Sequence, residues 1–271
     1  MLVMSTEKLI AVALPRFGKE MASMTLQAFF RQYPKAALGL SGGVDSAYLL
    51  SEGLRCGAEI RPYFVQTPFQ PAFEREDAEE LARSLGVALT VLPVDILAIP
   101  EVASNPEDRC YYCKNALFGA LKAAARRDGC EVILDGANAS DDALDRPGMR
   151  AARELGVLSP LRLCGVTKDE IRRRAKEAGL AVWDKPAYAC LATRVPAGQP
   201  LDAGLLQRVE QAEAVLFGMG FSDFRVRVFH DAARLQLRED QFSLALEKKE
   251  LLVRRLKPYF DGLLLDLAVS R

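Results

Sequence analysis

The sequence predicts an α/β protein in which a parallel sheet with helices on both faces is followed by a small α+β unit. Over the first two thirds of the chain, short apolar runs alternate with helical patterns, as in strands joined by crossover helices. Prolines and a glycine interrupt this alternation between residues 186 and 200. Beyond the interruption the order becomes helix, two strands, helix and strand, which indicates a second unit.

The first unit is expected to hold four strands that alternate with helices. The strands cover residues 36–40, 59–65, 87–94 and 131–135. The helices cover residues 44–55, 73–85, 111–127 and 167–178. Because the strands are parallel, their carboxyl ends meet at one edge of the sheet, where binding sites of such folds lie.

The second unit is expected to open with a helix and to close with a strand. Its helices cover residues 201–218 and 241–256, and its strands cover residues 224–229, 233–237 and 263–269. At about 70 residues it is small for a domain, so we expect it to dock on the first unit. The predicted domains are 1–188 and 189–271, the second for substrate binding and oligomerisation.

Composition limits the classes of function. The chain has 271 residues, 50% of them hydrophobic, with 36 Lys and Arg against 36 Asp and Glu. Zero net charge argues against a general nucleic-acid binder, which needs excess cations. No run approaches the roughly 20 apolar residues of a membrane span, and residues 1–17 lack a signal-peptide pattern. We therefore expect a cytoplasmic protein whose six cysteines are thiols or ligands rather than disulfides.

The strongest motif lies between the first strand and the first helix, at residues 38–46. Two glycines permit close backbone approach, and the helix that follows directs free N–H groups and its positive end at the loop. The Walker A ending Gly-Lys-Ser/Thr is missing, so the loop is not that of a kinase or GTPase. The residues expected around a bound phosphate are Gly39, Leu40, Ser41, Gly42, Gly43, Asp45 and Ser46.

The string Ser-Gly-Gly-Val-Asp-Ser at residues 41–46 resembles the pyrophosphate loop of the N-type ATP pyrophosphatases, the PP-loop superfamily. These enzymes split ATP into AMP and pyrophosphate while they adenylate a substrate. The resemblance implies an adenine nucleotide alpha hydrolase-like fold and the ligands ATP and Mg²⁺. It also places Gln66 and Gly136 near the nucleotide.

Further motifs, in order along the chain, narrow the resemblance. They cover residues 105–118, 135–138, 159–161, 167–170 and 183–194. Together they resemble the LarE family of sulfur transferases in nickel-pincer cofactor synthesis. Such proteins adenylate the carboxylates of pyridinium-3,5-biscarboxylic acid mononucleotide, and sulfur then displaces AMP to give thiocarboxylates. The resemblance also implies a homo-oligomer, a hexamer in this family, with small-molecule partners and neither nucleic acid nor membrane.

The LarE family uses two sulfur sources, and the cysteines bear on both. Cys190 matches the position of a catalytic cysteine that sacrifices its own sulfur. The sequence also holds Cys110 and Cys113, and three thiolates suit a [4Fe-4S] cluster with one iron left open. We expect the cluster on Cys110, Cys113 and Cys190. A Zn²⁺ site, a redox pair and donation from Cys190 alone remain alternatives.

Four more residues are assigned to the substrate: Arg194, Glu213, Arg225 and Arg227. Arg225 and Arg227 share one face of an expected strand and form a pair suited to the substrate phosphate, or else a solvated strand face. Arg194 suits an anionic substrate, with a surface ion pair as the alternative. Glu213 is either acidic support for the site or part of a solvated helix face.

Two other functions stay open. A PP-loop tRNA thiolase would need a basic RNA-binding surface or an added RNA module, and neither is visible in the sequence. A non-catalytic ATP-binding regulatory module would not release pyrophosphate in response to a substrate.

Overall fold

The computed structural model describes residues 24–141 and 147–268; the expectation about residues 1–17 lies outside these ranges. The first sheet confirms the predicted parallel α/β architecture. Its strands are β1 (Lys35–Gly39), β2 (Glu59–Gln66), β3 (Thr90–Pro93) and β4 (Ile133–Leu134). They pair in the order β3-β2-β1-β4, all parallel. The connection therefore reverses direction between β1 and β4, and folds of this type bind their ligands at the carboxyl ends of the strands at such a reversal.

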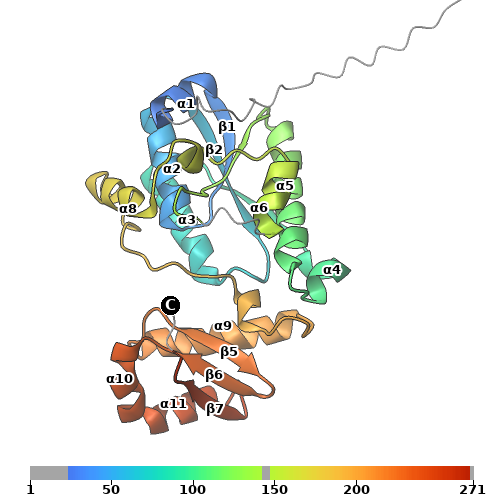
Figure 1. Ribbon diagram of the computed structural model, residues 1–271, viewed down its shortest axis with the longest axis vertical. Coiled ribbons are helices and arrows are strands. Elements are labelled where there is room, and N and C mark those ends of the chain that lie inside the picture. Colours follow the sequence, from blue (N-terminus) through green and yellow to red (C-terminus); the bar gives the residue numbers. More distant parts are fainter. Residues whose placement is uncertain (1–23, 142–146, 269–271) are drawn as a thin grey trace, which may run out of the picture.

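Helices cover both faces of this sheet, as Figure 1 shows. On one side lie α1 (Leu26–Gln32), α2 (Val44–Arg55), α3 (Ala72–Ser84) and α8 (Lys168–Glu177); on the other lie α5 (Arg109–Arg127) and α6 (Pro147–Glu154). The central strand shows the same division, because Ala36 and Leu38 pack in one apolar cluster and Ala37 packs with Phe118 in another. A strand buried on both faces is a near-continuous apolar run in sequence.

The second sheet belongs to the carboxyl-terminal third of the chain. Its strands are β5 (Arg225–Phe229), β6 (Ala232–Gln236) and β7 (Gly262–Asp266), with β5 antiparallel and β7 parallel to β6. The helices of this part are α9 (Ala203–Gly218), α10 (Phe242–Glu247) and α11 (Lys249–Leu256). Val226 and Val228 point into the core, so Arg225 and Arg227 occupy the opposite face of β5. The α+β prediction is confirmed.

Several elements differ from the sequence prediction for identifiable reasons. The strand expected from residue 87 begins at Thr90, because Gly86 adopts φ +70° and the Val87 N–H closes the end of α3 on Ala82. The helix expected over 241–256 is interrupted at Lys248, whose Nζ donates to the Met219 carbonyl at the end of α9. The short helices α1, α4 (Pro100–Ala103), α6 and α7 (Pro160–Leu163) were not predicted.

The two parts of the chain share one apolar core. Phe69, Ile96 and Val102, from loops and short helices that follow β2 and β3, are buried in the same cluster as Leu206 and Val209 of α9. Backbone hydrogen bonds join the same parts, since the Leu201 N–H donates to the Ala103 carbonyl at 2.7 Å. Among the described helices none has the length and apolar character to cross a membrane.

Candidate functional site

The phosphate loop connects β1 to α2 at the carboxyl edge of the sheet. Gly43 is the N-cap of α2 and provides no side-chain cap. The loop is closed on itself instead: the Ser41 N–H donates to Ser46 Oγ at 3.2 Å, and Ser46 Oγ lies 3.2 Å from the Gly43 carbonyl. The start of the helix therefore keeps free N–H groups for an anion.

Two glycines are required by close packing at this loop. Gly42 has φ +74°, and a Cβ there would lie 2.6 Å from the Glu74 carbonyl oxygen of α3. Gly136, just after β4, would bring a Cβ to 3.0 Å from the Ser46 nitrogen. The predicted Gly136 is thus adjacent to the loop, because β4 pairs with β1.

Asp45 connects the loop to α8 and offers a ligand for a cation. Its Oδ2 accepts a 2.7 Å hydrogen bond from Lys168 Nζ, while its Oδ1 is buried without a hydrogen-bond partner. Mg²⁺ at nucleotide sites takes one or two carboxylates plus phosphates and waters. A single unpartnered carboxylate oxygen beside a phosphate loop fits that donor set.

Three side chains that were not predicted as site residues also lie near the loop: Lys168, Lys185 and Glu74. Lys185 forms an ion pair with Asp77 of α3, and its Nζ lies 3.5 Å from the Gly42 carbonyl. Burial raises the pKa of Glu74 to about 7, with Lys185 and Arg194 opposing that shift. The two lysines lie within motifs that carried the family resemblance, whereas Glu74 left no signal in the sequence.

Cys190 reaches the same edge of the sheet through its neighbour Leu191. Cys190 is the N-cap of a short 3₁₀ helix, Leu191–Arg194, and the Leu191 N–H donates to the Phe69 carbonyl at 2.9 Å. Phe69 follows the end of β2, the strand beside β1. The segment from Ala189 to Arg194, which holds Cys190, is called the cysteine loop below. The structure thus brings it to the edge that holds the phosphate loop.

The three cysteines of the cluster hypothesis come from two elements, α5 and the loop before the 3₁₀ helix Leu191–Arg194. Cys110 is exposed at the start of α5, while Cys113, one turn later, is half-buried. Burial first, and then the charge of Cys190, raise the pKa of Cys113 to about 11. Cys113 and Cys190 also pack against the same apolar cluster. The three thiols are therefore near enough to interact electrostatically.

The spacing of these thiols bears on which metal group they suit. Within residues 24–141 and 147–268 no three Cys, His, Asp or Glu side chains lie close enough to hold a metal ion. A single Zn²⁺ contacts all its ligands directly, whereas a [4Fe-4S] cluster binds each thiolate on a different iron and so separates them. The assignment of a [4Fe-4S] cluster to the three cysteines stays a prediction.

Arg194 and Glu213 form a buried ion pair. Arg194 is 1% exposed, and its Nε and Nη2 donate to the two Glu213 carboxylate oxygens at 2.7 and 3.1 Å. Its Nη1 donates to the Ala189 carbonyl, directly before Cys190. Glu213 also accepts from the Val226 N–H. The pair therefore fixes the cysteine loop against α9 and β5, and is not the surface ion pair considered as the alternative.

Arg227 on β5 also contacts the segment that holds Cys190. Its Nη1 donates to the Thr193 carbonyl at 2.7 Å, within the 3₁₀ helix after Cys190. Burial, followed by the charges of Arg225, Arg194 and Arg234, lowers the pKa of Arg227. Such mutual repulsion is relieved when an anion binds. Arg225 lies two residues away on the same face and lines a cavity of about 500 Å³ with Lys185.

Gln66 occupies a different position. At the end of β2 its Oε1 accepts a 3.1 Å hydrogen bond from Arg75, and it lines a pocket of about 340 Å³ along α3. Its predicted approach to the adenine stays a prediction.

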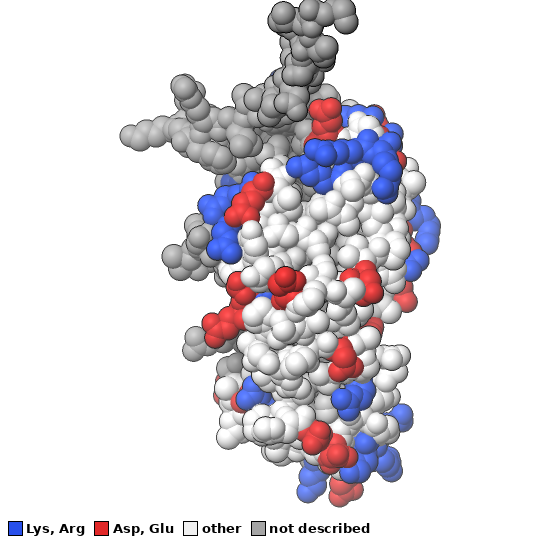
Figure 2. Space-filling model, turned by 90° about the vertical axis from the view of Figure 1, so that its right-hand side faces the viewer, with Lys and Arg blue, Asp and Glu red and all other residues white. Residues whose placement is uncertain are grey.

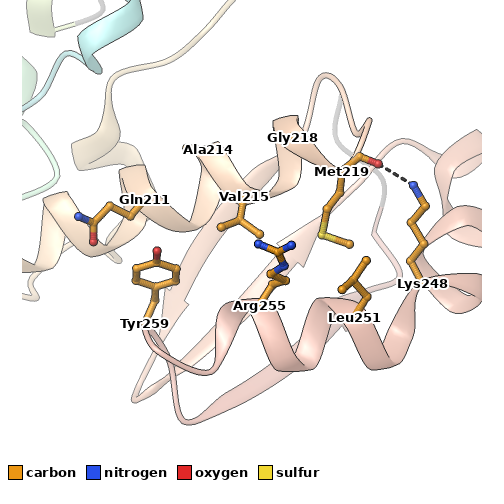
Figure 3. A pocket seen from close by; sticks show the side chains of 9 residues that line it. All are labelled: Gln211, Ala214, Val215, Gly218, Met219, Lys248, Leu251, Arg255 and Tyr259. Atoms are coloured by element: carbon orange, nitrogen blue, oxygen red, sulfur yellow. Dashed lines mark hydrogen bonds between the residues drawn. The ribbon is translucent and has the colours of Figure 1, made fainter.

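A further groove, of about 590 Å³, lies between α9 and α11, where Figure 3 shows Met219, Leu251 and Arg255. Its lining comes from the carboxyl-terminal part alone.

On the face drawn in Figure 2, Lys and Arg form small groups beside Asp and Glu, with mostly uncharged surface between them.

Similarity to known proteins agrees with these observations. No family model matches the chain. It is 36% identical over 217 residues to an uncharacterised protein of Synechocystis sp., covering 80% of this chain and 81% of that protein. It is 28% identical over 187 residues to a tRNA-specific 2-thiouridylase of Pseudothermotoga lettingae, covering 56% of this chain and 54% of that enzyme.

The relative that identifies the family is the pyridinium-3,5-bisthiocarboxylic acid mononucleotide synthase of Lactiplantibacillus plantarum. The two sequences are 30% identical over 217 residues, which is 79% of each chain. The phosphate loop and the cysteine loop, which carried the resemblance in the sequence, lie at one edge of the sheet. The chain therefore belongs to the LarE family of the PP-loop superfamily.

Proposed function

We propose that this protein is an ATP-dependent sulfur transferase of nickel-pincer cofactor synthesis. It adenylates the carboxylates of pyridinium-3,5-biscarboxylic acid mononucleotide and converts them to thiocarboxylates. The observation that carries the proposal is the shared sheet edge, where the Leu191–Phe69 hydrogen bond holds the cysteine loop beside the phosphate loop. The named synthase from Lactiplantibacillus plantarum supports the choice of substrate.

Adenylation needs the phosphates held and their charge offset. A substrate carboxylate attacks the α-phosphorus of ATP, and pyrophosphate leaves. The N–H groups at the start of α2 bind the departing pyrophosphate, and Lys168 orients Asp45. When bound through Asp45, Mg²⁺ neutralises charge on the phosphates. Arg225 and Arg227 hold the phosphate of the substrate.

Sulfur transfer then proceeds at the cysteine loop. The acyl adenylate supplies a good leaving group, so a sulfur nucleophile attacks the acyl carbon and AMP departs. Cys110, Cys113 and Cys190 are the ligands of the proposed [4Fe-4S] cluster, which, when bound, would supply a sulfide on its open iron. The alternative is that Cys190 donates its own sulfur.

Pyrophosphate release tests the proposed reaction. With ATP and Mg²⁺, the protein should release pyrophosphate only when the pyridinium biscarboxylate is added, because the carboxylate is the attacking group. Release of pyrophosphate at the same rate without that substrate would contradict the proposal. A non-catalytic regulatory module would release no pyrophosphate under either condition.

Anaerobic reconstitution with iron and sulfide tests the cluster. The iron–sulfur absorption band should be lost in Cys110→Ala, Cys113→Ala and Cys190→Ala. It should persist in Cys164→Ala, whose thiol is half-buried in a different apolar cluster. An unchanged band in Cys110→Ala would remove that residue from the ligand set.

A tRNA thiolase is the second candidate, favoured by the similarity to the tRNA-specific 2-thiouridylase. Binding of tRNA through a basic surface weakens steeply with salt, by a log–log slope of about −0.7 to −0.9 for each phosphate contacted. We expect weak tRNA binding with a shallow slope. Tight binding with a slope equivalent to several phosphates would favour the thiolase.

A further inference from the structure

Arg109 is a buried cation beside the cysteines, and the reaction above does not use it. It is the first residue of α5, is 7% exposed, and precedes Cys110. Its Nη2 lies 3.8 Å from Cys110 Sγ, a sulfur contact rather than an ion pair. Its other terminal nitrogen, Nη1, is buried and has no hydrogen-bond partner.

The guanidinium also faces the loop of Cys190. Its Cζ lies over the Phe69 ring, 5.4 Å from the ring centroid. Phe69 in turn accepts the hydrogen bond from Leu191, the residue after Cys190. Arg109 thus contacts Cys110 directly and reaches the Cys190 loop through Phe69.

Burying a guanidinium with an unpaired N–H donor costs free energy of folding unless an anion accepts a hydrogen bond from it. An unsatisfied buried donor loses its hydration, and a charged donor loses more than a neutral one. Elsewhere in this site, buried Arg194 has a bidentate carboxylate partner, Glu213. For Arg109 no ion pair is found among the described residues, although it is nearly as buried.

We propose that Arg109 is an anion-binding residue of the sulfur site, and that its ligand is hydrosulfide held beside Cys110, Cys113 and Cys190. This inference rests on the proposed function, because sulfur transfer is what calls for hydrosulfide here. The step is non-covalent: the guanidinium donates a hydrogen bond to HS⁻, and no electrons move.

The surroundings select hydrosulfide over larger anions. The unpartnered nitrogen has almost no contact with solvent, and the neighbouring groups are a thiol and an aromatic ring. A phosphate dianion carries two charges that would have to be desolvated, whereas hydrosulfide is a small, soft, singly charged anion. A single buried cation beside a thiol and an aromatic ring therefore suits hydrosulfide.

Calorimetric titration of the reduced, iron-free protein with sodium hydrosulfide under anaerobic conditions tests the proposal. Arg109→Gln should weaken binding at least about tenfold, the value of a charge-assisted hydrogen bond. Arg109→Lys keeps the charge but loses the planar guanidinium over the Phe69 ring, so its binding should lie between those of Arg109→Gln and the wild type. Arg126→Gln is the matched control, because Arg126 is an exposed cation in the last turn of the same helix, away from the cysteines at its start.

A second measurement uses the wild-type protein alone and does not depend on a variant that folds. Iodoacetate and iodoacetamide alkylate thiols by the same chemistry but differ in charge. The ratio of the iodoacetate rate to the iodoacetamide rate should be several-fold higher at Cys110 than at Cys164, because the anionic reagent is attracted to Arg109. The pKa of Cys164 is raised by burial, and no charged group contributes to that shift. Alkylated peptides are quantified by mass spectrometry.

The assignment would be overturned if the wild type bound no hydrosulfide, or if the wild type and Arg109→Gln bound it equally. Titration with inorganic phosphate and with acetate completes the set, and tighter binding of either would exclude hydrosulfide as the ligand. None of these readouts needs ATP, iron or the pyridinium substrate. The pyrophosphate and cluster assays can therefore fail independently.

Discussion

At the scale of single residues, the Arg194–Glu213 pair shows how a site residue can act through structure. Removing one partner of a buried pair leaves the other charge unpaired, which costs about 3–5 kcal/mol. Arg194→Ala should therefore lower the free energy of unfolding by that amount in urea denaturation. Arg173→Ala is the control, since the Arg173–Glu177 pair is about 60% exposed and is worth less than about 1 kcal/mol. Equal losses would contradict the structural role.

Glu74 gives a prediction about pH. Its folded pKa of about 7 lies above the ordinary value of 4.5, so between these values the folded protein holds a proton that the unfolded chain has released. Its stabilising contribution is thus full below about pH 4.5 and is lost as the pH rises through about 7. Lys185, Asp77 and Arg194 are the charged groups that face it.

Glu74→Gln removes this titration. The variant should gain stability relative to the wild type as the pH rises from 5 to 8, by up to about 3 kcal/mol before solvent screening. Urea midpoints at each pH unit measure the difference. Parallel curves for the two proteins would show that Glu74 does not titrate in this range.

At the scale of elements, the two glycines of the phosphate loop differ in how closely other atoms approach them. Gly42→Ala places a Cβ 2.6 Å from the Glu74 carbonyl at φ +74°. It should cost about 1–3 kcal/mol of stability and abolish ATP binding, because α3 and the loop must separate. Gly43→Ala meets nothing nearer than Ser41 Oγ at 3.6 Å, so its melting temperature should stay near that of the wild type. A stable Gly42→Ala that still binds ATP would contradict this packing.

The elements also show what the sequence can reveal. Helix α2 was predicted with its observed bounds, because a glycine-rich loop starts it and a helical pattern fills it. The four-residue helices α4 and α7 are too short to leave a periodic pattern. The end of the helix at Gly86 was predicted, but the start of β3 at Thr90 was not. The Val87 N–H is taken up by the Ala82 carbonyl at the end of α3, so the strand begins later than its apolar run.

At the scale of the whole molecule, the two units are held by a common core. Ile96 is fully buried, belongs to the first part of the chain, and packs in the cluster that contains α9. Ile96→Ala should cost about 2–5 kcal/mol and should speed amide hydrogen exchange in β5 and β6. Val253→Ala, at a side chain 54% exposed, should leave exchange unchanged. Faster exchange confined to the first sheet would show that the units unfold separately.

The assembly of the site is also a property of the whole molecule. Motif spacing identified the phosphate loop and three cysteines, because each is a local string. Glu74 and Lys185 were assigned no part in the site, since only the tertiary fold places α3 and Lys185 against the phosphate loop. The pairing of Arg194 with Glu213, 19 residues apart, likewise depends on how α9 docks.

In the proposed reaction, one sheet edge joins ATP-dependent activation to sulfur delivery. The most direct measurement is mass analysis of both small molecules and protein after incubation of the reconstituted protein with ATP, Mg²⁺ and the pyridinium biscarboxylate. The account predicts a thiocarboxylate product, AMP and an intact Cys190. Loss of one sulfur from Cys190 would transfer the donor role from the cluster to that cysteine. Absence of thiolated product, with the substrate unchanged and no AMP formed, would contradict the account.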